Sequence, residues 1–154
     1  MFKGKAFESE DIKKGYFSFI YLITDLKNNK RYIGQKMFFT KKPVTKNKVT
    51  KKVTVESDWK KYFSSSETIK SMVAEHGSDN LVREIIYICA SKGQANYLET
   101  KLQFELGCLE NNSMWYNGIV NCRVNHSHVK MDTLRDTDEV LLKQLYSTYR
   151  KEPI

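Results

Sequence analysis

The sequence predicts a small α+β protein in which helices flank a three-stranded, mainly antiparallel sheet. Two runs rich in aromatic and branched residues, "YFSFIYLIT" and "RYIGQ", lie on either side of a short polar connection, as in a hairpin. A third apolar run, "LVREIIYIC", has the length of a buried strand. Segments with helical spacing of apolar residues lie before and after this third run.

The first hairpin brings two tyrosines together. Its first strand, at 16–24, is expected to be buried on both faces, and Asn28 and Asn29 tolerate the left-handed backbone of a tight turn. A turn centred on these asparagines pairs residues whose numbers sum to about 57, so Tyr21 would lie opposite Lys36. Because side chains alternate along a strand, Tyr21 and Tyr32 would share one face with Gly34.

Residues 37–61 form a lysine-rich insertion, in which "NKVTKKVTVES" alternates well enough for a short exposed hairpin or edge strand. Segment 36–61 holds nine lysines against Glu56 and Asp58, so it carries +7 of the net charge of +8. Such a local positive strip attracts phosphate backbones, although a solvated, solubilising loop is the alternative. The lysines expected to bind nucleic acid here are Lys36, Lys46, Lys48, Lys51 and Lys52.

Two helices begin with a capping-box spacing. Ser64 stands three residues before Glu67 and opens a helix that Gly77 ends, while Ser91 stands three residues before Gln94 and opens a helix through Leu106. Near the C-terminus, "DTDEVLLKQLYSTYR" is an amphipathic helix whose leucines lie on one side.

The predicted organisation is a charged, aperiodic and loosely held leader (1–15), a single domain (16–120) containing the insertion, and a tail (121–154) with the amphipathic helix. Three cysteines without a CxxC pair argue against a disulfide framework and for a reducing compartment. The chain contains no apolar signal region and no run long enough to span a bilayer, so a cytoplasmic location is expected.

Four motifs then occur in a recognisable order. "FIY" at 19–21 and "YIG" at 32–34 are separated by ten residues, "YFSSSETIKSMVAEHGSDNLVREIIYI" follows, "YLETK" contains Glu99, and "WYNG" contains Asn117. Over about residues 16–118 this resembles the GIY-YIG nuclease superfamily, and especially phage-borne, homing-type endonucleases. Phe19 stands where the name-giving glycine usually is.

The resemblance implies a metal-dependent endonuclease that hydrolyses phosphodiester bonds in DNA, for homing or genome processing. It implies that Glu99 holds Mg²⁺ or Mn²⁺, that Tyr21 and Tyr32 act at the water and the phosphate, and that Asn117 supports the site. A free tyrosine has a pKa near ~10, so it is a poor base unless a metal or nearby cations stabilise the phenolate. Helical spacing alone favours Glu99 and Glu105 equally; the resemblance selects Glu99.

One expected residue is missing from the pattern. Family members carry an arginine in the helix after YIG, yet no arginine occurs between Arg31 and Arg83. Lysines would have to take this role, and Lys60 and Lys61 are the first candidates, followed by Lys36 and then Arg83. Tyr62 stands where other members place a histidine or second tyrosine near the scissile phosphate.

The segment "CRVNHSHVK" offers further contacts. Arg123 and His128, together with His126 and Lys130, could touch DNA phosphates, although an exposed edge segment explains the pattern equally well. Cys108 and Cys122 with the two histidines could bind zinc, but the close first pair of a zinc finger is missing.

The expected partner is double-stranded DNA, in the cytoplasm of a bacterial host if the protein is phage-encoded, and self-association through the C-terminal helix is conceivable. One alternative is a catalytically weak or inactive accessory protein that keeps the fold and binds nucleic acid. Another is a small structural protein that does not bind nucleic acid.

Overall fold

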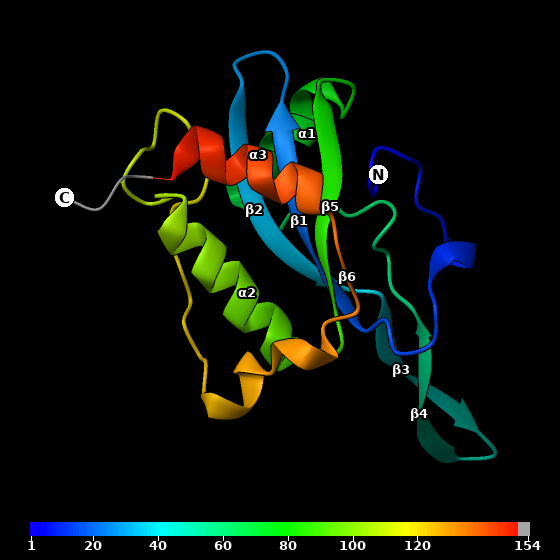
Figure 1. Ribbon diagram of the computed structural model, residues 1–154. Coiled ribbons are helices and arrows are strands. Elements are labelled where there is room, and N and C mark those ends of the chain that lie inside the picture. Colours follow the sequence, from blue (N-terminus) through cyan, green and yellow to red (C-terminus); the bar gives the residue numbers. More distant parts are fainter. Residues whose placement is uncertain (151–154) are drawn as a thin grey trace.

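The computed structural model describes residues 1–150 and has the α+β architecture that the sequence predicts. A four-stranded antiparallel sheet has the order β2-β1-β5-β6, as Figure 1 shows. Its strands are β1 (Ser18–Asp25), β2 (Lys30–Met37), β5 (Leu81–Cys89) and the short β6 (Asp136–Thr137). The helices are α1 (Glu67–His76), α2 (Lys92–Glu105) and α3 (Glu139–Tyr149), with short 3-10 turns at Ser9–Asp11, His126–Val129 and Met131–Thr133.

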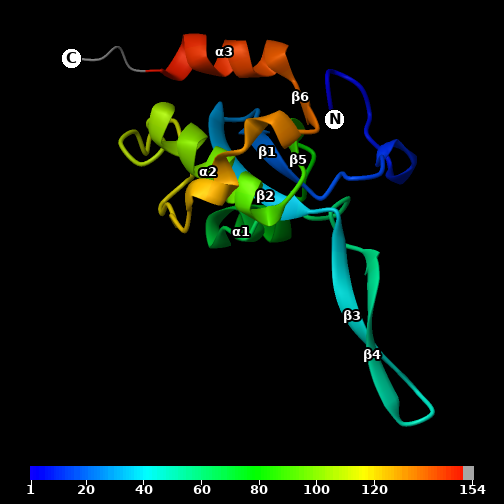
Figure 2. The same ribbon diagram turned by 60° about the horizontal axis from the view of Figure 1, so that its bottom comes forward.

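Helices cover both faces of the sheet. In Figure 2, α2 and α3 lie on one side and α1 on the other. Leu98 and Leu102 of α2 pack with Leu145 of α3 in one apolar cluster, whereas Ile69 of α1 belongs to a second cluster on the opposite face. Strand β1 is therefore buried along its whole length, as its continuous apolar sequence predicts. None of the helices in residues 1–150 is long and apolar enough to cross a membrane.

The register of the first hairpin differs from the prediction by two residues. Tyr21 pairs with Gly34, and Lys36 pairs with Phe19 instead. The turn contains four residues rather than two, because the amide of Asn29, which has φ 59°, donates to the carbonyl of Asp25. A shift of two residues restores the original faces, so the prediction that Tyr21 and Tyr32 share a face is confirmed.

Only one of the two predicted helix starts is correct. Helix α1 begins at Glu67 with Ser66 as its N-cap, since the Ser64 hydroxyl instead accepts from the amide of Ser66. Helix α2 begins as predicted, with the Ser91 hydroxyl accepting from the amide of Gln94 at 3.1 Å.

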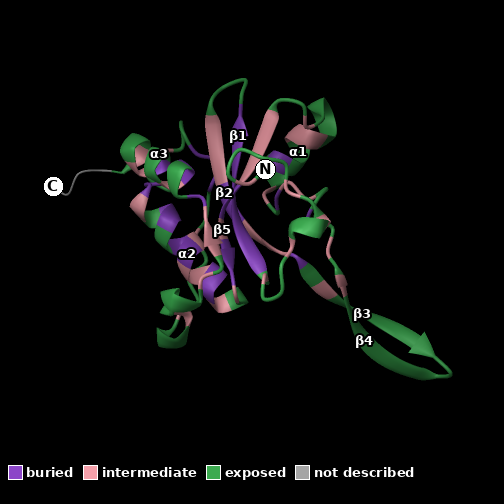
Figure 3. Ribbon diagram, turned by 45° about the vertical axis from the view of Figure 1, so that its right-hand side comes forward, coloured by how far each residue is buried: buried purple, intermediate pink, exposed green. Residues whose placement is uncertain are grey.

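The lysine-rich segment forms a separate two-stranded ribbon of β3 (Phe39–Lys46) and β4 (Val49–Glu56). We call residues 39–56 the arm. It projects away from the body, and nearly all of its residues are exposed (Figures 2 and 3). Asn47 and Lys48, at φ 52° and 60°, form the two-residue turn at its tip.

The leader is packed against the body, so the prediction that it is loosely held is wrong. The amino group of Met1 donates to the carbonyl of Arg83 at 2.9 Å, and the amide of Ile85 donates to the carbonyl of Met1 at 2.8 Å. The Phe7 ring lies 5.8 Å from the rings of both Phe38 and Trp59. Isolated aromatic residues in this charged segment are enough to bind it to the α1 face.

Candidate functional site

A cavity of about 450 Å³ lies where α2 meets the outer edge of β2. It brings together four of the predicted site residues, Tyr21, Tyr32, Glu99 and Arg123. They come from three parts of the chain: the first hairpin, helix α2 and the tail. The other lining residues are Gln35, Ser65, Lys92, Asn96, Gln103, Ile119 and Asn121.

The cavity opens at the edge of the sheet because β2 is only partly covered there. The segment before Asn117 forms a parallel bridge from Trp115 to Arg31. Asn117 then holds Ile33, accepting from its amide at 3.0 Å and donating to its carbonyl at 2.8 Å. In the described chain no strand pairs with this edge beyond Ile33, and Gln35 of this edge lines the cavity. Asn117 therefore fixes the backbone of β2 at Ile33, next to the cavity.

Gly34 allows the two tyrosines to lie against the strand. A Cβ at this position would overlap with the Tyr21 hydroxyl and would lie 2.8 Å from the Tyr32 ring. The two rings are 6.3 Å apart, centre to centre. Glycine is therefore required at this position by a close approach of side chains rather than by an unusual backbone angle.

Glu99 approaches the tyrosines from the other face of the sheet. Its carboxylate accepts from the Gln35 side chain at 2.5 Å and from the Gln103 side chain at 3.3 Å. Gln35 also donates to Asn96 at 2.7 Å. Burial raises the pKa of Glu99, and the bonds from Gln35 and Gln103 oppose that rise. Within residues 1–150 no lysine or arginine forms a salt bridge with Glu99, so neutral amides surround this carboxylate.

The two tyrosines differ in their environment. Tyr21 is only 1% exposed, and burial strongly raises its pKa, so its hydroxyl stays protonated at neutral pH. Tyr32 is half-buried and nearer to solvent. Tyr62 packs edge-on against Tyr21 at 6.3 Å, but it belongs to the cluster on the α1 face and does not line the cavity.

Two cations line the cavity, and both come from positions other than those predicted for the missing arginine. Lys92 is the first residue of α2, and Arg123 lies in the extended segment after Asn117. Ile119, Asn121 and Arg123 reach the cavity at alternate positions, as expected for an extended chain. The carbonyl of Asn121 accepts from the Thr100 hydroxyl of α2 at 3.5 Å.

The cations predicted to replace the missing arginine have other partners. Lys60 forms a salt bridge with Glu8 at 2.9 Å, and Lys36 forms one with Asp58 at 2.7 Å while lying 3.9 Å over the Tyr62 ring. Lys61 is exposed outside the cavity.

Two further predicted contacts with nucleic acid are also engaged within the chain. The guanidinium of Arg83 donates to the carbonyls of Trp59, Lys60 and Tyr62, so it stabilises this turn and is not free to clamp a phosphate. The Nδ1 of His128 accepts from the amide of Asn125 at 3.2 Å, and its ring lies over Gly93.

The donors in this cavity fit a small divalent cation. One carboxylate and several amide and hydroxyl oxygens are hard ligands, and Mg²⁺ is commonly held by one or two carboxylates while water and phosphate complete its shell. Among residues 1–150, no three His, Cys, Asp or Glu side chains lie close enough together to hold a metal alone. Any metal held by Glu99 would therefore need oxygens from water or from a bound anion.

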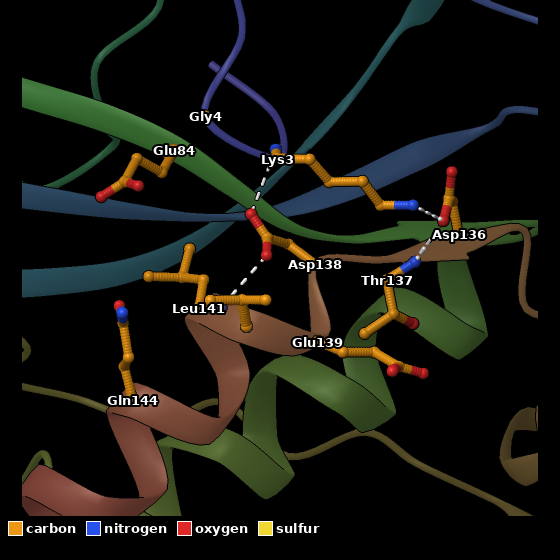
Figure 4. A pocket seen from close by; sticks show the side chains of 10 residues that line it. Lys3, Gly4, Glu84, Asp136, Thr137, Asp138, Glu139, Leu141 and Gln144 are labelled. Atoms are coloured by element: carbon orange, nitrogen blue, oxygen red, sulfur yellow. Dashed lines mark hydrogen bonds and ion pairs between the residues drawn. The ribbon is translucent and has the colours of Figure 1, made fainter.

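A second, larger hollow of about 620 Å³ lies between the leader and the start of α3 (Figure 4). Two of its carboxylates have structural partners. Asp138 accepts from the amides of Lys3 and Leu141, both at 3.1 Å, and Asp136 forms a salt bridge with Lys3 at 2.8 Å. Glu84 and Glu139 also line this hollow, which gives it a negative balance that repels phosphate.

Several residues of the cavity near Glu99 were not predicted from the sequence. Asn96, Glu99 and Gln103 have helical spacing and form a polar stripe beside the apolar stripe of α2, so this signal was available. Lys92 and Gln35 carried no comparable signal, since a lysine at a helix start and a glutamine after a strand are common surface residues.

The comparisons with known proteins gave one match. The family model described as "Putative endonuclease segE, GIY-YIG domain" matches residues 1–120. This range contains the leader, the hairpin, the arm, α1, β5, α2 and Asn117. Searches of curated proteins and of solved structures found no match.

Proposed function

We propose, since the chain belongs to the segE-type family of GIY-YIG endonucleases, that it hydrolyses phosphodiester bonds in double-stranded DNA with Mg²⁺ or Mn²⁺. The observation that carries this proposal is the meeting of Tyr21, Tyr32 and Glu99 in one cavity that also contains two cations. A buried carboxylate surrounded by amides, next to two phenol side chains and two cations, suits a negatively charged substrate whose phosphate oxygens help to hold the metal ion.

In this proposal Glu99 holds the metal ion, with the side-chain oxygens of Gln35, Asn96 and Gln103 available around it. A bound Mg²⁺ or Mn²⁺ would supply positive charge to the phosphoryl oxygens and would make the attacking water more acidic. Tyr32 would accept the proton of the attacking water only as a phenolate, which the metal ion and the nearby cations would stabilise, and Tyr21 would donate a hydrogen bond to the phosphate. Asn117 keeps the β2 edge in place through Ile33.

Arg123 and Lys92 neutralise the phosphate in this proposal. Charge builds up on the phosphoryl oxygens during hydrolysis, and positioned cations stabilise it most where water is partly excluded. Arginine can also contact two phosphate oxygens at once, which lysine cannot. The positive charge that the family arginine is expected to supply thus comes, in this proposal, from the tail segment after Asn117 and from the start of α2.

The test is nicking of a supercoiled plasmid with Mg²⁺ or Mn²⁺ by the wild type and by Glu99→Gln. We expect the variant to lose cleavage by a factor of about 10³, because a neutral amide holds a divalent cation poorly. DNA affinity, measured without metal, should stay within about twofold of the wild type.

A matched control is Glu105→Gln, which makes the same change on the same helix. Glu105 accepts from the Tyr146 hydroxyl and lies outside the cavity, so nicking should be retained. Equal loss in both variants, or persisting cleavage by Glu99→Gln, would refute Glu99 as the metal ligand. DNA binding without cleavage by the wild type would instead favour the accessory protein that keeps this fold.

A further inference from the structure

The two faces of the arm differ in chemistry. On one face, three of the four cross-strand pairs consist of a lysine and a valine: Lys42 with Val53, Val44 with Lys51, and Lys46 with Val49; the fourth is Thr40 with Val55. We call this the valine face. The opposite face contains Thr45 paired with Thr50 and Lys41 paired with Thr54, together with the Pro43–Lys52 pair, and we call it the threonine face.

The valines of this face are exposed without any partner in the protein. Val44, Val49 and Val53 are 49%, 55% and 43% exposed, and within residues 1–150 the two strands of the arm pair only with each other. Three exposed branched side chains in a row on one face cost solvation free energy, which a partner surface would recover.

The charge of the arm identifies the kind of surface that fits. Residues 40–55 contain six lysines and no aspartate or glutamate. The lysines alternate with the valines on the valine face, so a complementary surface must offer apolar groups and negative charge at close spacing. The major groove of DNA does this, since thymine methyl groups lie on its floor and phosphates line both walls.

The dimensions of the arm also fit this groove. Two strands about 4.8 Å apart form a ribbon that the major groove, about 12 Å wide, accepts. Each strand has eight residues and spans about 26 Å, or roughly eight base pairs. The narrow and deep major groove of double-stranded RNA does not accept such a ribbon.

We propose that the arm inserts into the major groove of DNA with its valine face toward the bases, where Val44, Val49 and Val53 contact thymine methyl groups and the lysines contact phosphates. The insertion of the arm depends on the proposed function in one respect only, namely that DNA is the substrate. The arm would then supply the sequence preference of the enzyme at a distance from the cavity where the bond is cut.

The experiment compares the affinity of the whole protein for a pool of random duplexes containing thymine with that for the same pool containing uracil, without metal and at fixed salt. Uracil lacks only the C5 methyl group. The wild type should bind the thymine pool more tightly, by about fourfold for each methyl contact. The variant Val44→Ser/Val49→Ser/Val53→Ser should bind both pools equally.

The control is Thr45→Ser/Thr50→Ser/Thr54→Ser on the threonine face, which removes one methyl group at each of three positions, leaves the charge unchanged and lowers strand propensity in the same two strands. This control should keep the preference for thymine. Equal binding of both pools by the wild type, or an equal loss of preference in both variants, would overturn the proposal. Because binding is measured without cleavage, a missing preference refutes the groove contact alone, and a missing nicking activity refutes the proposed function alone.

Discussion

At the scale of single residues, the cavity depends on close approaches that sequence patterns reveal only in part. The alternation of the hairpin predicts that Tyr21, Tyr32 and Gly34 share a face, and the structure confirms this. The reason for a glycine at 34 is visible only in three dimensions, because the Tyr21 hydroxyl occupies the space of its missing side chain. The choice of Glu99 rather than Glu105 as the metal ligand also depended on the family resemblance, since helical spacing allowed either residue.

The variant Gly34→Ala tests this close approach. The new methyl group overlaps with the Tyr21 hydroxyl and must displace one or both tyrosine rings, so we expect the nicking rate to fall by about 10²-fold. Gly118→Ala is the matched control, since no atom lies within 4 Å of a Cβ added there. Wild-type nicking by Gly34→Ala would show that the tyrosines need not lie against β2.

At the scale of elements, the strands and helices were largely predictable from periodicity and caps, because local spacing determines them. The end of a helix at Gly77 and the Ser91 cap are examples. The register of the first hairpin was missed by two residues, since turn length depends on backbone bonds such as that from Asn29 to Asp25. The path of residues 117–123 along the cavity was not predictable either, because this segment has no regular secondary structure.

The course of residues 117–123 along the cavity leads to a prediction about which residue replaces the missing family arginine. If the tail segment supplies the cation, Arg123→Gln should lower the single-turnover nicking rate by about 10²-fold while the metal requirement stays the same. Lys61→Gln removes one positive charge outside the cavity and should change the rate by less than about threefold. A large loss of rate in Lys61→Gln with little change in Arg123→Gln would instead assign the function of the missing arginine to the lysines that follow the arm.

At the scale of the whole molecule, the leader and α3 complete the two apolar clusters on opposite faces of the sheet. The leader adds Phe7 to one cluster, and α3 adds Leu141 and Leu145 to the other. The sequence alone did not reveal the contribution of the leader, because two aromatic residues in a charged segment form no periodic pattern. The apolar face of α3 is used inside the chain, and self-association through this helix stays an untested prediction.

The buried thiols of this core predict how stability changes with pH. Burial raises the pKa of both Cys89 and Cys108 from 9.0 to about 12. Both pKa values are higher in the folded than in the unfolded state, so their stabilising contribution is complete below about pH 9 and is lost as the pH rises toward 12. Urea unfolding under reducing conditions should show a free energy of unfolding that falls by about 1.4 kcal/mol per pH unit and thiol in this range. Cys108→Ala should reduce that slope, and a constant free energy from pH 8 to 11 would contradict this view of the core.

We propose above that Glu99 holds the metal ion in the cavity between β2 and α2. An anomalous-scattering map of crystals grown with Mn²⁺ and a short duplex tests it most directly. We expect a manganese peak within bonding distance of a Glu99 carboxylate oxygen, with a phosphate oxygen of the duplex in the same cavity. A peak in the acidic hollow at Asp136 and Asp138, with none at Glu99, would contradict it.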